Sequence, residues 1–185
     1  VVMDSGGPDY DHIWITESLR GLVSGTLSIK VSHEGIHSGT SGGSRPSSFR
    51  IARKILDRVE DSGTGEVLVP EMHVEITQDL NEKAESLAAV VGESLWEQLP
   101  TVDSLTPVSP RVSDMILGMN WQPSMCVIGA DGLPSVQVAG NVLRTNTDLK
   151  LSFRIPPGVE AESLEPILKE LLESDPPYGA EVSFV

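Results

Sequence analysis

Two stretches of the chain alternate apolar and polar residues with the period of a half-buried β-strand. The first lies within residues 18–32, and in the second every other residue from 149 to 155 is apolar. Lys150 and Arg154 fall between the apolar positions, so we expect both on the face of the sheet away from the core. Residues 181–185 predict a final strand.

Three other stretches have apolar residues every three or four positions, which is typical of amphipathic helices. The first helix is expected to begin at Pro46 or the serines after it and to end near Gly63. The second is expected over residues 81–99 and the third over residues 159–173. Pro166 is compatible with the third helix only if it lies in the first turn.

A third apolar region, residues 121–138, is interrupted by Asp131-Gly132, a turn signal that predicts a hairpin of two strands. Without residues 67–117, the order is strand, helix, strand or hairpin, strand, helix, strand. This order predicts an α+β, ferredoxin-like fold with an antiparallel sheet, helices packed on one face, and an inserted helical segment. The other face and the edges of the sheet are then available to a partner.

Composition narrows the classes of function. The 185 residues suffice for one domain with an insertion, and 13 basic against 27 acidic residues give a net charge of -14. This charge disfavours nucleic acid and anionic membranes as partners. The sequence has neither an apolar run of about 20 residues nor a leader pattern, so we expect a cytoplasmic protein. Cys126 lies in an apolar run and is expected to be buried and inert.

The strongest candidate for chemistry is His37, which lies in a glycine-rich loop over residues 35–43. Glycines allow sharp turns and close backbone approach, so such a loop can hold a histidine at an exposed corner. A phosphate-binding loop is disfavoured because the segment lacks a Gly-Lys-Ser/Thr ending. Two interpretations stay open at this point. His37 either acts on a ligand or only hydrogen-bonds its own turn.

Three motifs occur in order along the chain: Ser18-Leu19-Arg20-Gly21, then His37-Ser38-Gly39 with Gly42-Gly43, then Gly140-Asn141-Val142-Leu143-Arg144. Together they resemble the lid, or dimerisation, domain of dinuclear-zinc peptidases. That family includes carnosinases, aminoacylases, acetylornithine deacetylase, succinyl-diaminopimelate desuccinylase and glutamate carboxypeptidases. The resemblance spans essentially the whole chain. It implies that residues 1–17 end a catalytic domain and linker, and that residues 18–185 form the lid with an insertion at about 67–117.

The resemblance also implies roles for three residues. His37 would reach into the active site of the neighbouring subunit and stabilise the oxyanion of the tetrahedral intermediate. Asn141 would help to hold substrate across the dimer, and Arg154 would bind the terminal carboxylate of the substrate. The alternatives are structural: a turn histidine, an Asx turn at Asn141 and a solvated cation at Arg154.

Two further residues have a place in the resemblance. Arg144 occupies a position where many relatives have proline, and it would be either a second carboxylate contact or a loop salt bridge. Asp4 follows a strand-like run, where the family places a zinc-ligating aspartate. The other metal residues of the family, an upstream His-x-Asp, a Glu-Glu pair and a downstream His, are absent from this sequence. We therefore expect two zinc ions in the full-length enzyme and none in this chain.

The resulting hypothesis is a homodimerising lid of a zinc-dependent amidohydrolase that cleaves small peptides or N-acyl amino acids. The strand-like start of the sequence suggests a segment of a longer chain, which we expect to be inactive by itself. The alternative is a free-standing ferredoxin-like regulatory or protein-interaction module. Such a module would explain the fold and the glycine loop but not the three motifs in family order.

Overall fold

The computed structural model describes residues 11–185, so Asp4 lies outside the described residues. A four-stranded sheet runs through the molecule in the order β3-β5-β1-β6, and every neighbouring pair is antiparallel. The strands are β1 (Gly21–Lys30), β3 (Ser124–Asp131), β5 (Asn146–Ile155) and β6 (Glu181–Phe184). Strand β1, the first of the sheet along the chain, lies between β5 and β6, which are the third and the fourth. This is the ferredoxin-like order that the sequence predicts.

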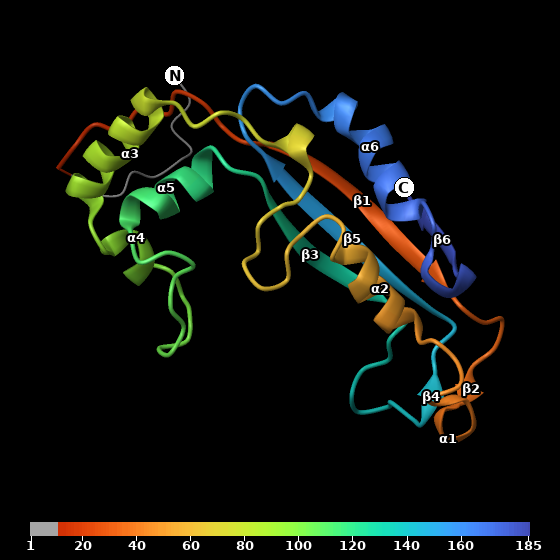
Figure 1. Cartoon of the computed structure of the whole chain (residues 1–185). Coiled ribbons are helices and arrows are strands. Elements are labelled where there is room, and N and C mark those ends of the chain that lie inside the picture. The colour runs from red at the N-terminus through yellow and green to blue at the C-terminus, as the bar shows by residue number, and fades with distance from the viewer. Residues whose placement is uncertain (1–10) are drawn as a thin grey trace.

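Two helices, α2 (Ser48–Leu56) and α6 (Ala161–Glu173), cover one face of the sheet (Figure 1). Their buried residues recur every three or four positions and meet the alternating apolar residues of β1 and β5. The fully buried core side chains include Leu27, Ile29, Ile51, Ile55, Leu151, Phe153, Leu164 and Leu168. Lys150 and Arg154 are exposed on the opposite face, as the alternation predicts.

The first helix is shorter than predicted. It begins after Ser47, whose side chain accepts a hydrogen bond from the amide of Arg50, and it ends at Leu56 rather than near Gly63. After it, the carboxylate of Asp61 accepts hydrogen bonds from the amides of Gly63 and Thr64 at 2.9 and 2.7 Å. This local turn satisfies backbone donors outside the helix, and the chain reverses direction across it so that Glu60 pairs with Val67.

The prediction that Pro166 must lie in the first turn of its helix is wrong. Helix α6 begins at Ala161 and contains Pro166 in its interior. Pro166 and Glu162, whose carbonyl loses its helical partner, are both exposed, so water can satisfy that carbonyl. Leu164, Leu168 and Leu172 are completely buried on the other side and hold the helix against the sheet.

The predicted hairpin over residues 121–138 is also wrong. Strand β3 pairs with β5, and the residues after Gly132 form an exposed loop instead of a second strand. The turn itself exists, because Gly132 has φ 85° and its α-carbon approaches the backbone of Asn146 too closely for a side chain. β5 has a long apolar face that continues the core, so it is the better partner for β3.

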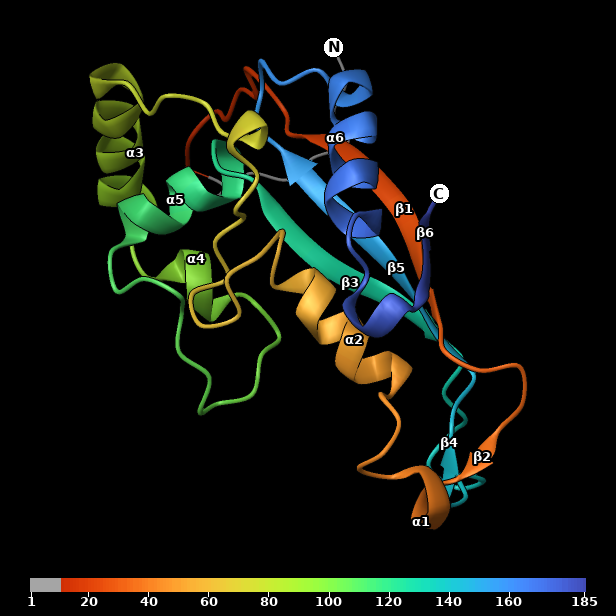
Figure 2. The ribbon, with the colours of Figure 1, turned by 45° about the vertical axis from the view of Figure 1, so that its right-hand side comes forward.

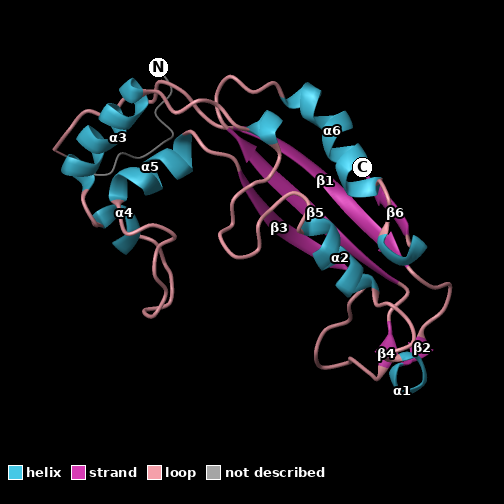
Figure 3. Ribbon diagram, in the orientation of Figure 1, coloured by secondary structure: helices cyan, strands magenta, loops and turns pink. Residues whose placement is uncertain are grey.

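The inserted segment forms a 3-10 helix, η1 (Pro70–Met72), and three α-helices: α3 (Gln78–Val91), α4 (Ser94–Glu97) and α5 (Val112–Asn120). Figure 3 shows the three α-helices grouped at one end of the sheet. The predicted helix over 81–99 breaks at Gly92, which has φ 56°, and no element was predicted over Val112–Asn120. The segment has an apolar cluster of its own, built on Ala84, Val91, Ile116 and Leu117, with Trp14 and Trp121 packed against it.

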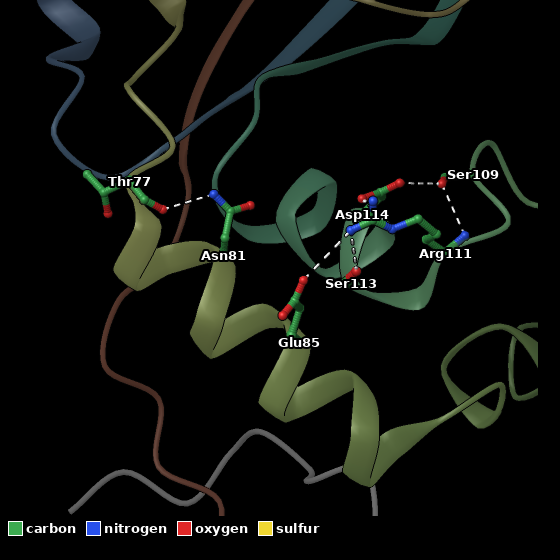
Figure 4. A network of polar contacts seen from close by, with 7 residues as sticks. All are labelled: Thr77, Asn81, Glu85, Ser109, Arg111, Ser113 and Asp114. Atoms are coloured by element: carbon green, nitrogen blue, oxygen red, sulfur yellow. Dashed lines mark hydrogen bonds and ion pairs between the residues drawn. The ribbon is translucent and has the colours of Figure 1, made fainter.

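Arg111 links α3 and α5 of this segment (Figure 4). Its guanidinium lies 3.5 Å from Asp114 of α5 and 4.0 Å from Glu85 of α3. Asp114 also accepts a hydrogen bond from Ser109 at 2.8 Å, which ties the loop before α5 to that helix. These are exposed pairs, so each contributes little by itself, and the apolar cluster supplies most of the stability.

Candidate functional site

Three candidate residues, His37, Asn141 and Arg144, lie on or beside a small projection beyond one end of the sheet. Strand β2 (Ile36–His37) pairs with β4 (Val142–Leu143), and the one-turn helix α1 (Ser38–Ser41) follows β2. Figures 1 and 2 both show this unit at the end of the molecule opposite helices α3 and α5. We call the unit, with the loops that form it (residues 35–44 and 132–143), the projection.

The projection brings His37 and Asn141 together. His37 lies opposite Val142 in the β2–β4 pair, and the amide of Ser38 donates to the carbonyl of Asn141 at 2.9 Å. The two residues are about a hundred positions apart in the sequence, yet one short backbone contact joins their loops. Both are exposed.

The ring of His37 is oriented by its own turn. Nδ1 accepts a hydrogen bond from the amide of Gly39 at 3.1 Å, so the proton of the neutral ring is assigned to Nε2. The same contact caps the N-terminus of α1. The turn interpretation and the ligand interpretation are therefore compatible, because the turn uses one ring nitrogen and leaves the other as an exposed donor.

Glycine is required at the end of this turn. A Cβ at Gly42 would lie 2.6 Å from the carbonyl oxygen of Ser38, which is too close for any side chain. Gly43 follows with φ 82°, in the left-handed region. These two positions let the chain leave α1 at once and return toward α2.

The base of the projection is fastened by a buried polar pair. The hydroxyl groups of Ser48, at the start of α2, and Thr147, at the start of β5, are 2.8 Å apart, and both residues are buried. The carbonyl of Thr145 accepts from the amide of Val31 at 2.8 Å. These contacts join the ends of both loops to the sheet. Sequence reasoning missed them, although the two hydroxyl residues interrupt otherwise apolar faces.

Asn141 and Arg144 make no hydrogen bond or ion pair through their side chains within residues 11–185. The carbonyl of Asn141, not its side chain, holds the turn. Arg144 is half-buried just after β4. Both polar groups are therefore available to a ligand.

Arg154 lies far from these residues. From Asn146 to Arg154 strand β5 advances about 26 Å at roughly 3.3 Å per residue. Arg154 is opposite Leu22 of β1 and Ser124 of β3, on the face without helices. A single chain thus does not bring Arg154 together with His37 and Asn141.

Arg20 lies near Arg154, and sequence reasoning gave it no role beyond a motif. Its Nη1 lies 3.2 Å from three acceptors: the carbonyls of Gly118 and Gln122 and the hydroxyl of Ser124. Partial burial and, secondly, the charge of Arg154 lower the pKa of Arg20. Arg20 thereby fixes the connection from α5 to β3 beside Arg154.

Cys126 corrects another prediction, because it is exposed rather than buried. Its neighbour Met125 takes the buried position in β3, so the alternation turns Cys126 to the face without helices, opposite Ser152. The apolar run around it was misleading because β3 is an edge strand, whose apolar residues are partly exposed.

Within residues 11–185, no group of three or more His, Cys, Asp or Glu side chains is placed to hold a metal ion. The described residues therefore do not fit a zinc site of their own. In the same part of the chain, no helix is both long and apolar enough to cross a membrane.

Neither a protein-family model nor a curated protein sequence matches this chain. Solved structures do. The dipeptidase Dug1p from Saccharomyces cerevisiae matches with a TM-score of 0.66 and 21% identity, over 90% of this chain and 35% of that one. Human carnosine dipeptidase 1 matches with a TM-score of 0.70 and 19% identity, over 95% and 39% of the two chains.

The M20 family metallo-carboxypeptidase Sso-CP2 from Sulfolobus solfataricus also matches, with a TM-score of 0.60 and 18% identity, over 90% of this chain and 37% of that one. The chain has the fold of one part of these peptidases. The fold that the sequence resemblance implied is therefore confirmed. This chain spans little more than a third of the length of each of the three structures.

Proposed function

We propose that this chain is the lid and dimerisation domain of a zinc-dependent peptidase or amidohydrolase that cleaves small peptides or N-acyl amino acids. The observation that carries the proposal is the pairing of His37 and Asn141 on a projection that extends beyond the sheet. The shared fold with peptidases supports it. A free-standing regulatory module would not need an exposed histidine donor that is held on a projection away from the sheet.

The proposed chemistry of His37 is donation of a hydrogen bond from Nε2 to the oxyanion that forms at the scissile carbonyl. Such a donor lowers the barrier by roughly 3 kcal/mol when it is held in place before the reaction. The bond from Gly39 to Nδ1 holds the ring, and the exposed loop brings it to the reacting group. Asn141, beside it, would orient the substrate.

We propose that the active site is composite. Arg154 lies about 26 Å along β5 from the base of the projection, at roughly 3.3 Å per residue, so one chain cannot place Arg154 and His37 on a small substrate. In a dimer with a two-fold axis, each active site would contain Arg154 from one chain and His37 with Asn141 from the partner chain. Arg154 would bind the terminal carboxylate through its planar fork.

The proposed dimer surface combines the β3 edge with the adjoining side of α2. Helix α6 contacts β1 and β6, and α2 contacts β1 and β5, so the side of α2 away from α6 adjoins β3. Lys54 lies on the side of α2 that faces α6, and its Nζ is 5.6 Å from the centre of the Tyr178 ring. Phe49 and Leu56 are seven residues apart, so they share one face of α2, and this face is the one away from Lys54.

This surface is apolar as well as unpaired. Phe49 is half-exposed, and Val127 and Ile128 of β3 are 45% and 63% exposed. An edge strand with apolar side chains and free backbone groups favours pairing with another strand. A second copy of β3 would satisfy it through a self-complementary contact.

Zinc in this proposal belongs to the complete peptidase. Its role there would be to activate water for attack on the scissile carbonyl. Of the present sequence, only Asp4 has a place in that site, and it lies outside the described residues.

The proposal is tested in the complete protein that contains this segment. We expect zinc-dependent hydrolysis of dipeptides or N-acyl amino acids, and a loss of at least 100-fold in kcat on His37→Ala. The 185-residue chain alone is expected to be inactive. Unchanged activity of His37→Ala, or hydrolysis by the isolated chain, would refute the proposed role.

A further inference from the structure

The projection is free of charged residues in a strongly acidic chain. Residues 35–44 and 132–143 contain no Lys, Arg, Asp or Glu, although the chain as a whole has a net charge of -14. Each uncharged stretch is bounded by charges, with Glu34 and Arg45 around the first and Asp131 and Arg144 around the second. The uncharged surface therefore coincides with the projection and not with the sheet that bears it.

The same surface exposes apolar side chains. Val136 and Val138 are 86% and 73% exposed, and Leu133 and Val142 of the same loop are also exposed. Backbone hydrogen bonds form turns within this loop. The amide of Val138 donates to the carbonyl of Ser135 at 3.1 Å, and the amide of Val142 donates to the carbonyl of Gly140 at 2.8 Å. Apolar side chains that are exposed to water together on one loop are typical of a contact surface.

We propose that Val136 and Val138 form a docking surface that packs against a second copy of this chain's complete protein, at the rim of the site that His37 enters. This inference rests on the proposed function and extends it to the residues that drive the insertion. They would exclude water around the His37 donor without touching the reacting atoms.

Charge favours a second copy as the occupant. Two copies of this chain, each with a net charge of -14, repel, and burying charged groups at their contact would add a desolvation cost. A projection without charges can approach an acidic partner closely without either penalty. A cationic partner, by contrast, would be attracted to the acidic remainder of the surface and would gain nothing from the uncharged projection.

The test is a charge placed on the docking surface in the complete protein. We expect the double variant Val136→Asp/Val138→Asp to lose at least tenfold in kcat/KM while its sedimentation mass stays that of a dimer, because the β3 edge is untouched. The matched control is the double variant Val102→Asp/Val108→Asp, at two valines of the inserted segment that are 69% and 95% exposed. It is expected to keep parental activity.

A second measurement reports docking without catalysis. In a Cys126→Ser background, Val136→Cys introduces one thiol on the projection, and its labelling rate is measured above and below the dimer dissociation constant. We expect at least fivefold slower labelling in the dimer. Equal labelling rates, or a Val136→Asp/Val138→Asp variant within twofold of parental activity, would overturn the docking proposal.

The two proposals fail differently. If His37→Ala is inactive and the double Asp variant is fully active, the docking surface is wrong and the proposed function stands. If His37→Ala is fully active, the proposed function is wrong, and the docking proposal falls with it.

Discussion

The amide of Gly39 donates a hydrogen bond to Nδ1 of His37, at 3.1 Å. This contact makes His37 the N-cap of its own turn and leaves Nε2 as the donor. The structural role and the proposed chemical role of His37 therefore belong to different nitrogens of one ring, and substitutions can separate them.

His37→Asn is expected to keep the cap and to remove the donor. Asparagine is among the best N-cap residues, so the cap should remain and the melting temperature should stay within about 2 °C of the parent. Loss of the cap would instead cost about 1 kcal/mol of unfolding free energy. The shorter side chain does not reach as far as Nε2, so kcat of the complete enzyme should fall by about 10² to 10³. Thermal unfolding and steady-state kinetics check the two halves. A variant that loses stability and activity in parallel would show that His37 acts only through the turn.

Arg154 is expected to recognise a carboxylate and not the reacting amide. Arg154→Lys keeps the charge but loses the bidentate fork, so KM for a substrate with a free terminal carboxylate should rise about 10-fold or more. With the corresponding terminal amide, the variant and the parent should have similar KM. Arg144→Lys serves as the comparison and is expected to have the smaller effect. Equal effects on both substrates would contradict the assignment.

The edge of β3 is expected to hold the dimer. A lysine at an exposed edge position disfavours strand pairing, so Ile128→Lys should raise the dimer dissociation constant at least tenfold, about 1.4 kcal/mol. Analytical ultracentrifugation measures this directly, with Val108→Lys as the control on another exposed apolar residue. A mass unchanged by Ile128→Lys would place the interface elsewhere.

The elements that the sequence predicts well are those in which local pattern and core agree. Leu149, Leu151 and Phe153 alternate because β5 is central and one of its faces is buried. Prediction fails where tertiary contacts decide: Cys126 looks buried from its neighbours, but edge position exposes it. Pro166 is expected to be compatible only with the first turn of its helix, but packing of α6 against the sheet carries the helix through it.

The candidate site divides in the same way. His37 and Asn141 each belong to a motif, so they can be found in the sequence, but nothing local predicts that their loops pair. Arg20 also belongs to a motif, but its role cannot be predicted from it, because its partners include carbonyls that become neighbours only after α5 and β3 form. Contacts between distant segments leave no periodic signal in either segment.

The Ser48–Thr147 pair offers a test of how the projection is anchored. Thr147→Val is expected to leave the buried Ser48 hydroxyl without a partner and to cost about 1–3 kcal/mol of unfolding free energy. Adding Ser48→Ala should recover part of that loss, because neither polar group then remains. Urea unfolding of the four chains in this double-mutant cycle gives the coupling. Strict additivity would mean that the hydroxyls do not pair.

Asp61 is expected to make the free energy of unfolding depend on pH in the acidic range. Hydrogen bonds from the amide and hydroxyl of Thr64, and then from the amide of Gly63, lower the pKa of Asp61. A carboxyl whose pKa is lower in the folded state adds stability that is fully present above its unfolded pKa, about 3.9, and is lost as pH falls through the lower folded value. Asp61→Asn should therefore flatten the fall in unfolding free energy below about pH 4. Asp57→Asn, which removes an exposed carboxylate with no hydrogen bond within residues 11–185, is the control. Parallel curves for Asp61→Asn and the parent between pH values of about 2 and 5 would show that the turn after α2 does not depend on the charge of Asp61.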